Sequence, residues 1–306
     1  MLDRANPYYR QVELLVRVLP LIAKAQCFAL KGGTAINLFF QNLPRLSVDI
    51  DLVYLPREPR DQAMAGITQA LNRTADEIER VFAGAKVNRL ASAGGTCNKL
   101  QIAAGGVQIK VEVSPVLRGA VMPVVSMAVS EAVSETFGYL EAPLLDRGEL
   151  YAGKIVAALD RQHPRDLFDV KMFLEGDGLS ARLMDLFIVY LASSPRPMAE
   201  ILSPRLQPLE GVFETQFEGM SLLPVTVDEL SEVRRHLIES VNLNLTDGHK
   251  EFLLSFKAGH PDWTRLPWDE VDALPALQWK LHNIRKMSAK KRDQALAKLK
   301  AVLSEE

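Results

Sequence analysis

The hydrophobic pattern of the chain changes near residue 145. Before this point, segments with apolar residues at helical spacing alternate with short segments in which apolar and polar residues alternate, as in half-buried strands. The helical segments are 8–25, 34–42 and 60–84. The strand candidates are 28–33, 47–55, 86–92, 99–104 and 107–114. Glycine pairs at 94–95 and 105–106 separate the last three strands, which predicts a meander.

Helical spacing dominates the rest of the chain. The segments that have it are 146–161, 164–175, 179–194, 226–242, 247–257 and 275–303. Connectors that contain proline, 203–224 and 259–275, interrupt them. We expect 121–137 to be an extended connection that returns to the edge of the sheet. The pattern predicts an α+β protein, with a mixed sheet flanked by helices in residues 1–143 and a helical domain in residues 144–306.

The composition is that of an ordinary globular protein. The 306 residues are 48% hydrophobic and 24% charged, against typical values of about 45–50% and about 25%. The formal net charge of −2 does not indicate a nucleic-acid partner, so such a signal must come from local patches. Cys27 and Cys97 are far apart and have no metal-binding spacing. No apolar run approaches the roughly 18–20 residues of a membrane span, and the N-terminus has no signal-peptide pattern. We therefore expect a cytoplasmic protein with no membrane partner.

Two carboxylates interrupt the strand candidate at 47–55. Because alternate residues of a strand point to the same face, Asp49 and Asp51 project together, while Ile50 and Leu52 face the core. Two parallel carboxylates repel each other, and a divalent cation relieves this repulsion. Mg²⁺ prefers oxygen ligands and keeps open positions for phosphate. The alternative is a solvent-facing edge strand, because acidic pairs of this kind are common in ordinary chains.

A turn of Gly32, Gly33 and Thr34 joins the preceding strand to a helix. Glycines allow a phosphate to approach the backbone, and a helix N-terminus offers free N–H groups. Thr34 is placed to be an N-cap or a phosphate ligand. Arg45 and Ser47 come just before the acidic strand and could shape the site or contact phosphate. The alternative is a plain glycine turn with a threonine cap.

A third carboxylate, Glu112, lies in the last strand of the predicted meander. It shares a face with Lys110, and if this strand lies beside the aspartate strand, Glu112 completes an acidic triad with Asp49 and Asp51. A surface Lys–Glu pair is the alternative. The three acids as metal ligands and the glycine turn as a phosphate site together indicate nucleotidyl transfer. Glu112 is then a second-metal ligand or a general base.

The segments LKGGTAINLFF (30–40) and RLSVDIDLVYL (45–55) resemble the nucleotidyltransferase-like toxins of the AbiEii/AbiGii family, within the DNA polymerase β-type nucleotidyltransferase superfamily. That superfamily has a Gly-Gly/Ser turn followed by Asp-x-Asp. A second segment, LYAGKIVAALDRQHPRDLFDVKMFL (150–174), is similar to a helical block of the family. The matching positions are Lys154, Arg161, Arg165, Asp166 and Asp169. The resemblance covers residues 28–175 and implies that residues 1–143 are a nucleotidyltransferase catalytic domain.

The second segment has charges at helical spacing. Lys154 and Arg161 are two turns apart and share a helix face, where they could grip a triphosphate as leaving-group charge builds. Asp166 and Asp169 share a face of the next helix and could orient Lys154 or contact the nucleotide. We expect Lys154 and Asp169 to be catalytic, and Lys154, Arg161 and Asp166 to bind the nucleotide. The alternatives are a solvated helix face and, for Asp169, a structural ion pair with Arg161 or Arg165.

The resemblance implies an enzyme dependent on Mg²⁺ or Mn²⁺ that transfers NMP from an NTP to a hydroxyl acceptor. It also implies the toxin of a bacterial toxin–antitoxin or abortive-infection (phage-defence) pair. Its partners would be a cognate antitoxin and an RNA acceptor, the 3′ end of tRNA. Two other hypotheses stay open. One is a small-molecule nucleotidyltransferase that modifies an antibiotic or metabolite, and the other is a non-catalytic nucleotide-binding module.

Positive charge gathers near the C-terminus. Residues 280–300 contain eight Lys or Arg residues and one acid, Asp293. A solvated helix face and an RNA-backbone surface are both compatible with this run. We expect the helical domain to complete the nucleotide site and to bind the acceptor. The three tryptophans, Trp263, Trp268 and Trp279, are predicted to be packing residues.

Overall fold

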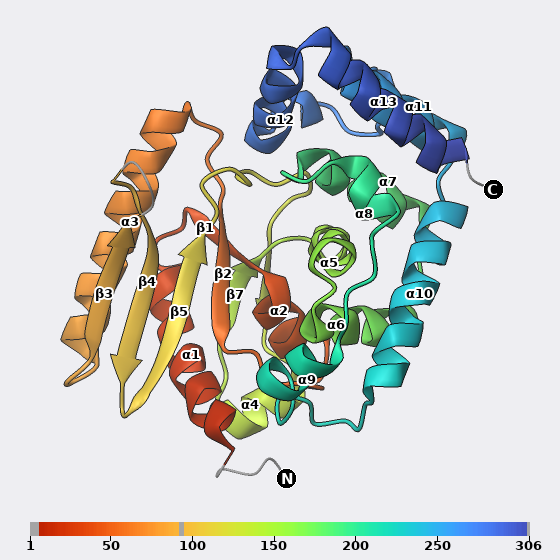
Figure 1. The fold of residues 1–306 in the computed structure, drawn as a ribbon. Coiled ribbons are helices and arrows are strands. Elements are labelled where there is room, and N and C mark those ends of the chain that lie inside the picture. The colour runs from red at the N-terminus through yellow and green to blue at the C-terminus, as the bar shows by residue number, and fades with distance from the viewer. Residues whose placement is uncertain (1–5, 92–94, 305–306) are drawn as a thin grey trace. The chain divides into compact units, whose positions relative to one another are not determined.

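Figure 1 shows a computed structural model of the chain, in which residues 6–91 and 95–304 are described. They form two compact units. The first consists of the described residues up to Leu150 and of Glu218–Pro224. The second consists of Tyr151–Phe217 and of the described residues from Val225 onward.

The division between the units falls inside helix α5 (Arg147–Arg161), a few residues after the expected boundary at 143/144. The first turn of α5 is tied to the first unit by Glu149. This buried carboxylate accepts hydrogen bonds from the backbone N–H groups of Val121 and Met122, at 2.9 Å each. The helical spacing of α5 runs without interruption through the point where the first unit ends and the second begins. The sequence pattern alone therefore does not mark the division between the units.

The first unit contains a seven-stranded mixed sheet, which confirms the predicted α+β class. In order across the sheet, the strands are β3 (Lys86–Ala91), β4 (Cys97–Ala104), β5 (Val107–Val113), β2 (Asp49–Tyr54), β1 (Phe28–Lys31), β7 (Glu141–Leu144) and β6 (Val125–Ala128). The pairs β2–β5 and β1–β7 are parallel, and the other neighbouring pairs are antiparallel. The predicted meander of β3, β4 and β5 is confirmed. The pattern missed β7, which has only four residues and contains Pro143. The expected extended connection at 121–137 does reach the sheet edge as β6, but its second half is helical, which the pattern did not predict.

Helices α1 (Pro7–Ala23) and α3 (Arg60–Val81) cover one face of this sheet (Figure 1). Asn6 caps α1, because its side chain accepts a hydrogen bond from Tyr8 N at 2.9 Å. Alternate residues of β5 are buried on this face: Ile109, Val111 and Val113. The residues between them, Gln108, Lys110 and Glu112, lie on the opposite face. The unit also contains α4 (Glu131–Phe137), α2 (Gly32–Ala35) and a π-helix, Ile36–Phe40.

A short segment from later in the chain, Glu218–Pro224, completes the first unit. Leu46 N donates to Met220 O at 2.8 Å, and Leu222 N donates to Pro44 O at 2.9 Å. These hydrogen bonds hold the loop that enters β2, which is the strand that carries the two aspartates.

The second unit is helical, as the pattern predicts. After α5 its helices are α6 (Pro164–Leu174), α7 (Ala181–Ser193), α8 (Met198–Leu202), α9 (Glu210–Gln216), α10 (Val227–Leu243), α11 (Asp247–Ala258), α12 (Pro275–Lys286) and α13 (Ala289–Ser304). Its core contains the fully buried rings of Phe168, Phe187, Phe217, Phe252 and Phe256. Capping boxes headed by Thr226 and Thr246 begin α10 and α11. None of the helices in the described ranges of either unit has the length and apolar character needed to cross a membrane.

The prediction of one helix at 275–303 is wrong, because this segment forms α12 and α13. Met287 leaves the helical region with ψ 145°, so α12 ends and the chain turns. Both helices bury apolar residues at helical spacing, for example Leu281 in α12 and Leu299 in α13. No glycine or proline marks the break, and the continuous spacing therefore concealed it.

Candidate active site

The register of the strands puts the predicted acids on one face of the sheet. β2 and β5 pair in parallel, with Asp51 opposite Glu112 and Asp49 opposite Lys110. Residues opposite each other on neighbouring strands share a face. The condition set for an acidic triad, that the strand of Glu112 lies beside the aspartate strand, is met, and both aspartates are partly exposed. On the other side of β2, Lys31 of β1 is opposite Asp51.

The Asp51 carboxylate projects toward the glycine turn. Among the residues described, its side chain makes no hydrogen bond and no ion pair. Its Oδ2 atom lies 2.7 Å from the point where a Cβ atom on Gly32 would be. Gly32 also has φ +73°, a conformation that other residues rarely adopt. Glycine at this position therefore allows the backbone after β1 to come close to the carboxylate.

Two lysines hold Glu112. Its carboxylate forms ion pairs with Lys99 Nζ at 3.0 Å and with Lys110 Nζ at 3.4 Å. Burial raises the pKa of Glu112, but the two lysines outweigh burial and lower this pKa below its usual value. Within residues 6–91 and 95–304, no three Asp, Glu, His or Cys side chains form a group that could hold a metal ion. Asp49 and Asp51 could together provide two carboxylate ligands for a cation. That Glu112 is a third ligand stays a prediction.

The Gly-Gly-Thr segment begins a short helix. Helix α2 (Gly32–Ala35) follows β1 directly, with Lys31 at the N-cap position, and continues as the π-helix. Thr34 is buried, and its hydroxyl donates to the backbone oxygen of Asp49 at 2.5 Å. The interpretation of Thr34 as an N-cap is therefore wrong. Its hydroxyl instead joins α2 to the start of the acidic strand, and a phosphate contact by Thr34 stays a prediction.

Arg45 and Ser47 are buried against the glycine turn. A Cβ atom on Gly33 would lie 2.5 Å from Arg45 Nη2 and 3.2 Å from Ser47 Oγ. Arg45 Nη1 donates to the backbone oxygen of Leu46 at 3.1 Å, and Ser47 Oγ lies 2.9 Å from Thr34 Oγ1. These contacts support the role of shaping the site. Contact of Arg45 or Ser47 with phosphate stays a prediction.

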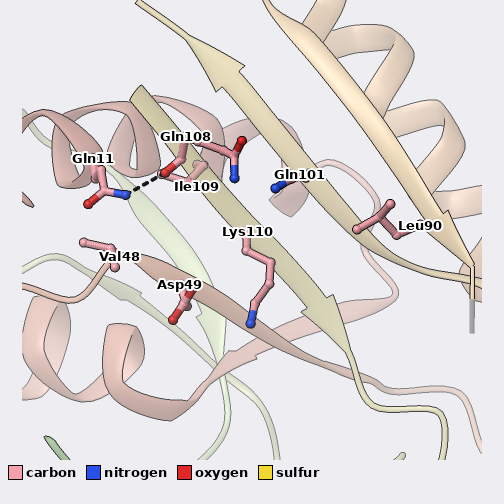
Figure 2. A pocket seen from close by; sticks show the side chains of 8 residues that line it. All are labelled: Gln11, Val48, Asp49, Leu90, Gln101, Gln108, Ile109 and Lys110. Atoms are coloured by element: carbon pink, nitrogen blue, oxygen red, sulfur yellow. Dashed lines mark hydrogen bonds between the residues drawn. The ribbon is translucent and has the colours of Figure 1, made fainter. Parts of the chain in front are cut away.

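An open cavity of about 280 Å³ lies beside Asp49 (Figure 2). Its lining consists of Gln11, Val48, Asp49, Leu90, Gln101, Gln108, Ile109 and Lys110. Gln11 of α1 donates from Nε2 to the backbone oxygen of Gln108 at 2.7 Å. Amide side chains can donate and accept hydrogen bonds, and Lys110 adds a cation. The cavity therefore offers neutral polar groups and one positive charge next to a predicted metal ligand.

The second unit contains a buried charge cluster that joins α5 to α6. Lys154 Nζ lies 3.0 Å from Asp166 Oδ1 and 2.8 Å from Asp169 Oδ2, and Arg161 Nη2 lies 2.7 Å from Asp166 Oδ2. The Lys154 side chain is 7% exposed and that of Asp169 is 0% exposed. Burial raises the pKa of Asp166, but Lys154 and Arg161 outweigh burial and hold this pKa below its usual value. The structure thus brings together four residues that the sequence singled out.

This geometry decides between some of the alternatives for the cluster. A solvated helix face is wrong for Lys154, which is buried, although the Arg161 side chain is 62% exposed. Both Asp166 and Asp169 contact Lys154, as expected of residues that orient it. Contact of Lys154, Arg161 or Asp166 with a nucleotide stays a prediction.

Sequence reasoning missed Glu149 and the glutamines of the cavity. Glu149 is in the first turn of α5, where acidic residues are common in any helix, so its position does not signal burial. The glutamines come from α1, β4 and β5, which only the fold brings together. No spacing along the chain could have found them.

Comparison with known proteins bears on this arrangement. A family model described as nucleotidyl transferase AbiEii toxin, type IV toxin–antitoxin system, matches residues 13–283. No curated protein matches the chain in sequence. Among solved structures, MenT4, a nucleotidyltransferase toxin from Mycobacterium tuberculosis H37Rv, has 14% sequence identity and a TM-score of 0.61. The likeness covers 97% of this chain and 95% of that one, and at this identity it shows the fold. Because the family model spans most of the chain, the resemblance seen in the sequence is confirmed, and the chain belongs to the AbiEii family of nucleotidyltransferase toxins of type IV toxin–antitoxin systems.

Proposed function

We propose that the chain transfers NMP from an NTP to the 3′ end of an RNA of the tRNA class, with Mg²⁺ or Mn²⁺ as cofactor. Family membership makes it a nucleotidyltransferase and a toxin with an antitoxin partner, which removes the non-catalytic module. The proposal rests on Asp49 and Asp51, which lie side by side next to the glycine turn. The reaction would take place in the cytoplasm, where NTPs and tRNA are present, and the resulting growth arrest would serve abortive infection.

Asp49 and Asp51 are the residues that would hold the cation. Both are partly exposed on one face of a single strand, and their mutual repulsion is relieved by a divalent cation with oxygen ligands. When bound, the cation neutralises the triphosphate and stabilises the charge of the departing pyrophosphate. The proposed phosphate contacts are the backbone N–H groups of the glycine turn. Gly32 and Gly33 leave room for Asp51 and Arg45 to pack closely against this turn, which holds its shape.

Glu112 is proposed as a ligand rather than as a general base. A carboxylate with a lowered pKa is a weaker proton acceptor, and Lys99 and Lys110 lower the pKa of Glu112. These lysines must turn away for Glu112 to reach a cation. Lys110, which is opposite Asp49, is then available to an anionic group of the substrate.

Lys154 is proposed to be a fixed cation that binds the nucleotide. Asp166 and Asp169 hold its ammonium group in one position, so little reorganisation is needed when leaving-group charge builds. Arg161 adds a second, more exposed cation. Asp169 is a positioning residue in this scheme, because it acts through Lys154. The acceptor is assigned to the second unit, on the grounds of its basic C-terminal helices.

Transfer to a small-molecule hydroxyl is the second candidate. The observation in its favour is the cavity beside Asp49, whose volume of about 280 Å³ is just below the range of about 300–1,000 Å³ for ligand pockets. A cavity of this size suits a small acceptor, but it also suits one terminal nucleotide of a longer acceptor.

The two candidates are separated by the chemical nature of the labelled product. Purified protein is incubated with Mg²⁺, each of the four α-labelled NTPs in turn, and either total bacterial tRNA or a mixture of metabolites and antibiotics. We expect label on tRNA with one NTP, and none with Asp49→Asn protein. Label found only on small molecules would establish the second candidate instead, and label on neither would contradict both.

A substitution in the glycine turn tests the geometry of the phosphate site. We expect Gly33→Ala to lower transfer on the order of a hundredfold, since a shift of about 1 Å in a positioned group can cost this much. The added methyl group would overlap Arg45 Nη2, which must move. Gly211→Ala is the control, because no heavy atom lies within 4 Å of its added Cβ. Rates are measured with labelled NTP, and equal rates for the two variants would show that the turn has no such role.

A further inference from the structure

Trp279 of α12 is exposed, in contrast to its predicted role in packing. Its relative exposure is 52%, and its ring stacks on that of His282, with centroids 6.0 Å apart and planes 22° apart. Trp279, His282 and Lys286 are three and four residues apart, so they lie on one face of α12. The exposed neighbours on this helix, Gln278 and Asn283, are polar. On α12 the ring pair is therefore an aromatic platform flanked by polar side chains.

Four cations follow this platform. Lys286, Lys290, Lys291 and Arg292 form no ion pair with any residue in the described part of the chain. The last three lie in the first turn of α13, which contains no acidic residue. Cations at a helix N-terminus are disfavoured by the helix dipole. This cluster therefore opposes the stability of α13, and a bound anion would compensate it.

Two other cations of the same basic run have structural roles. Lys280 donates to the backbone oxygens of Ser194 and Arg196, at 2.5 and 2.6 Å. Burial, with the charge of Lys257, lowers the pKa of Lys280 to about 8. Arg285 donates to the backbone oxygen of Gly259 at 3.0 Å. Lys298 and Lys300 of the same run are also exposed and lie further along α13. We call the group nearer the ring pair, Trp279, His282, Lys286, Lys290, Lys291 and Arg292, the aromatic–basic surface.

We infer that the aromatic–basic surface binds a single-stranded segment of the RNA acceptor, with a base stacked on Trp279 and backbone phosphates beside the four cations. This inference rests on the proposed RNA acceptor. Exposed aromatic rings interleaved with unpaired cations are what single-stranded nucleic acid requires, because every base has a face that stacks. A protein partner would be expected to bury a continuous apolar patch, which α12 does not offer. The family model ends at residue 283, so the four cations lie beyond the residues that it matches.

The test measures RNA binding without catalysis. Fluorescence anisotropy follows a labelled single-stranded oligoribonucleotide of about a dozen nucleotides, without NTP or divalent metal. The variants are Trp279→Ala, Trp279→Phe and the double variant Lys290→Gln/Lys291→Gln. Tyr139→Ala removes another exposed aromatic ring, and Lys24→Gln/Arg80→Gln removes two cations from elsewhere in the chain.

We expect Trp279→Ala to raise the Kd about tenfold and Trp279→Phe to raise it much less, because stacking on the ring is retained. Each phosphate contact on a single strand contributes about 0.7 to the slope of log Kd against log salt. Loss of two such contacts in the lysine double variant should therefore reduce this slope by about 1.4. Both controls should bind as the wild type does. Equal affinity and equal salt slope in all variants would overturn the inference.

The outcome for this surface can be told apart from that of the proposed function. Asp51→Asn protein should bind the oligoribonucleotide as the wild type does, since the assay contains neither metal nor NTP. Binding that depends on Trp279, without any transfer to RNA, would contradict the proposed acceptor and leave the RNA surface in place. Transfer to tRNA at full rate by the Trp279→Ala protein at limiting RNA concentration would contradict the surface only.

Discussion

Asp51→Asn is expected to lower nucleotidyl transfer on the order of a thousandfold or more, because the neutral amide cannot replace a carboxylate that holds a metal–triphosphate. The substitution keeps the size and shape of the side chain. The protein should stay folded, since Asp51 makes no hydrogen bond or ion pair with any residue described and the change removes repulsion from Asp49. Transfer of labelled NMP at saturating NTP measures the loss, and a thermal melt checks the fold.

Asp228→Asn is the matched control for this prediction. It makes the same chemical change at an exposed position in the first turn of α10. We expect a wild-type rate, because Asp228 lies outside the predicted site. An Asp51→Asn protein that kept more than about a tenth of the wild-type rate would contradict the assignment, since loss of even one preorganised catalytic group costs about a hundredfold or more.

Lys154→Met is expected to destabilise the protein by about 3–5 kcal/mol, the range for breaking a buried ion pair by removal of one partner. Lys154 is buried and contacts Asp166 and Asp169 at 3.0 and 2.8 Å. Methionine fills similar space but removes the ammonium group that both buried carboxylates contact, while Arg161 still pairs with Asp166. Denaturation in urea, followed by circular dichroism, measures the change in free energy of unfolding.

Lys171→Met separates this effect from the loss of any lysine. Lys171 lies on α6 and pairs with Glu175 at 2.6 Å, where the glutamate side chain is well exposed. A surface pair of this kind contributes about 0–1 kcal/mol. Adding Asp169→Asn to Lys154→Met should recover part of the lost stability, because one buried charge is removed. If Lys154→Met were no more destabilising than Lys171→Met, the cluster would not be the buried structural centre of this helix pair.

The acidic face of the site could be predicted because it depends on a local rule. Alternation in a strand puts Asp49 and Asp51 together whatever the rest of the fold is, and it also puts Lys110 with Glu112. Their pairing across β2 and β5 could only be stated as a condition, since strand order comes from tertiary packing. The helical block was predictable for the same reason, because helical spacing alone aligns the cations of α5 and the acids of α6.

The parts that could not be predicted depend on packing between distant segments. Thr34 has the sequence features of an N-cap, but its hydroxyl bonds to Asp49 of the neighbouring strand. The prediction of a packing role for Trp279 rests on residue type alone, although helical spacing puts it on the opposite side of α12 from the buried Leu277 and Leu281. The ion pairs of Glu112 with Lys99 also arise only when β4 and β5 pair.

Mn²⁺ binding is the most direct measurement of whether the two aspartates hold a metal–nucleotide. Electron paramagnetic resonance counts free and bound Mn²⁺ in the presence of a non-hydrolysable NTP analogue, for wild type, Asp51→Asn and Asp228→Asn. We predict tight binding by the wild type and by Asp228→Asn, and a loss of more than about a hundredfold in Asp51→Asn, since carboxylate oxygens are the ligands such cations need. Equal Mn²⁺ affinity in Asp51→Asn and wild type would show that the aspartates of β2 do not hold the metal.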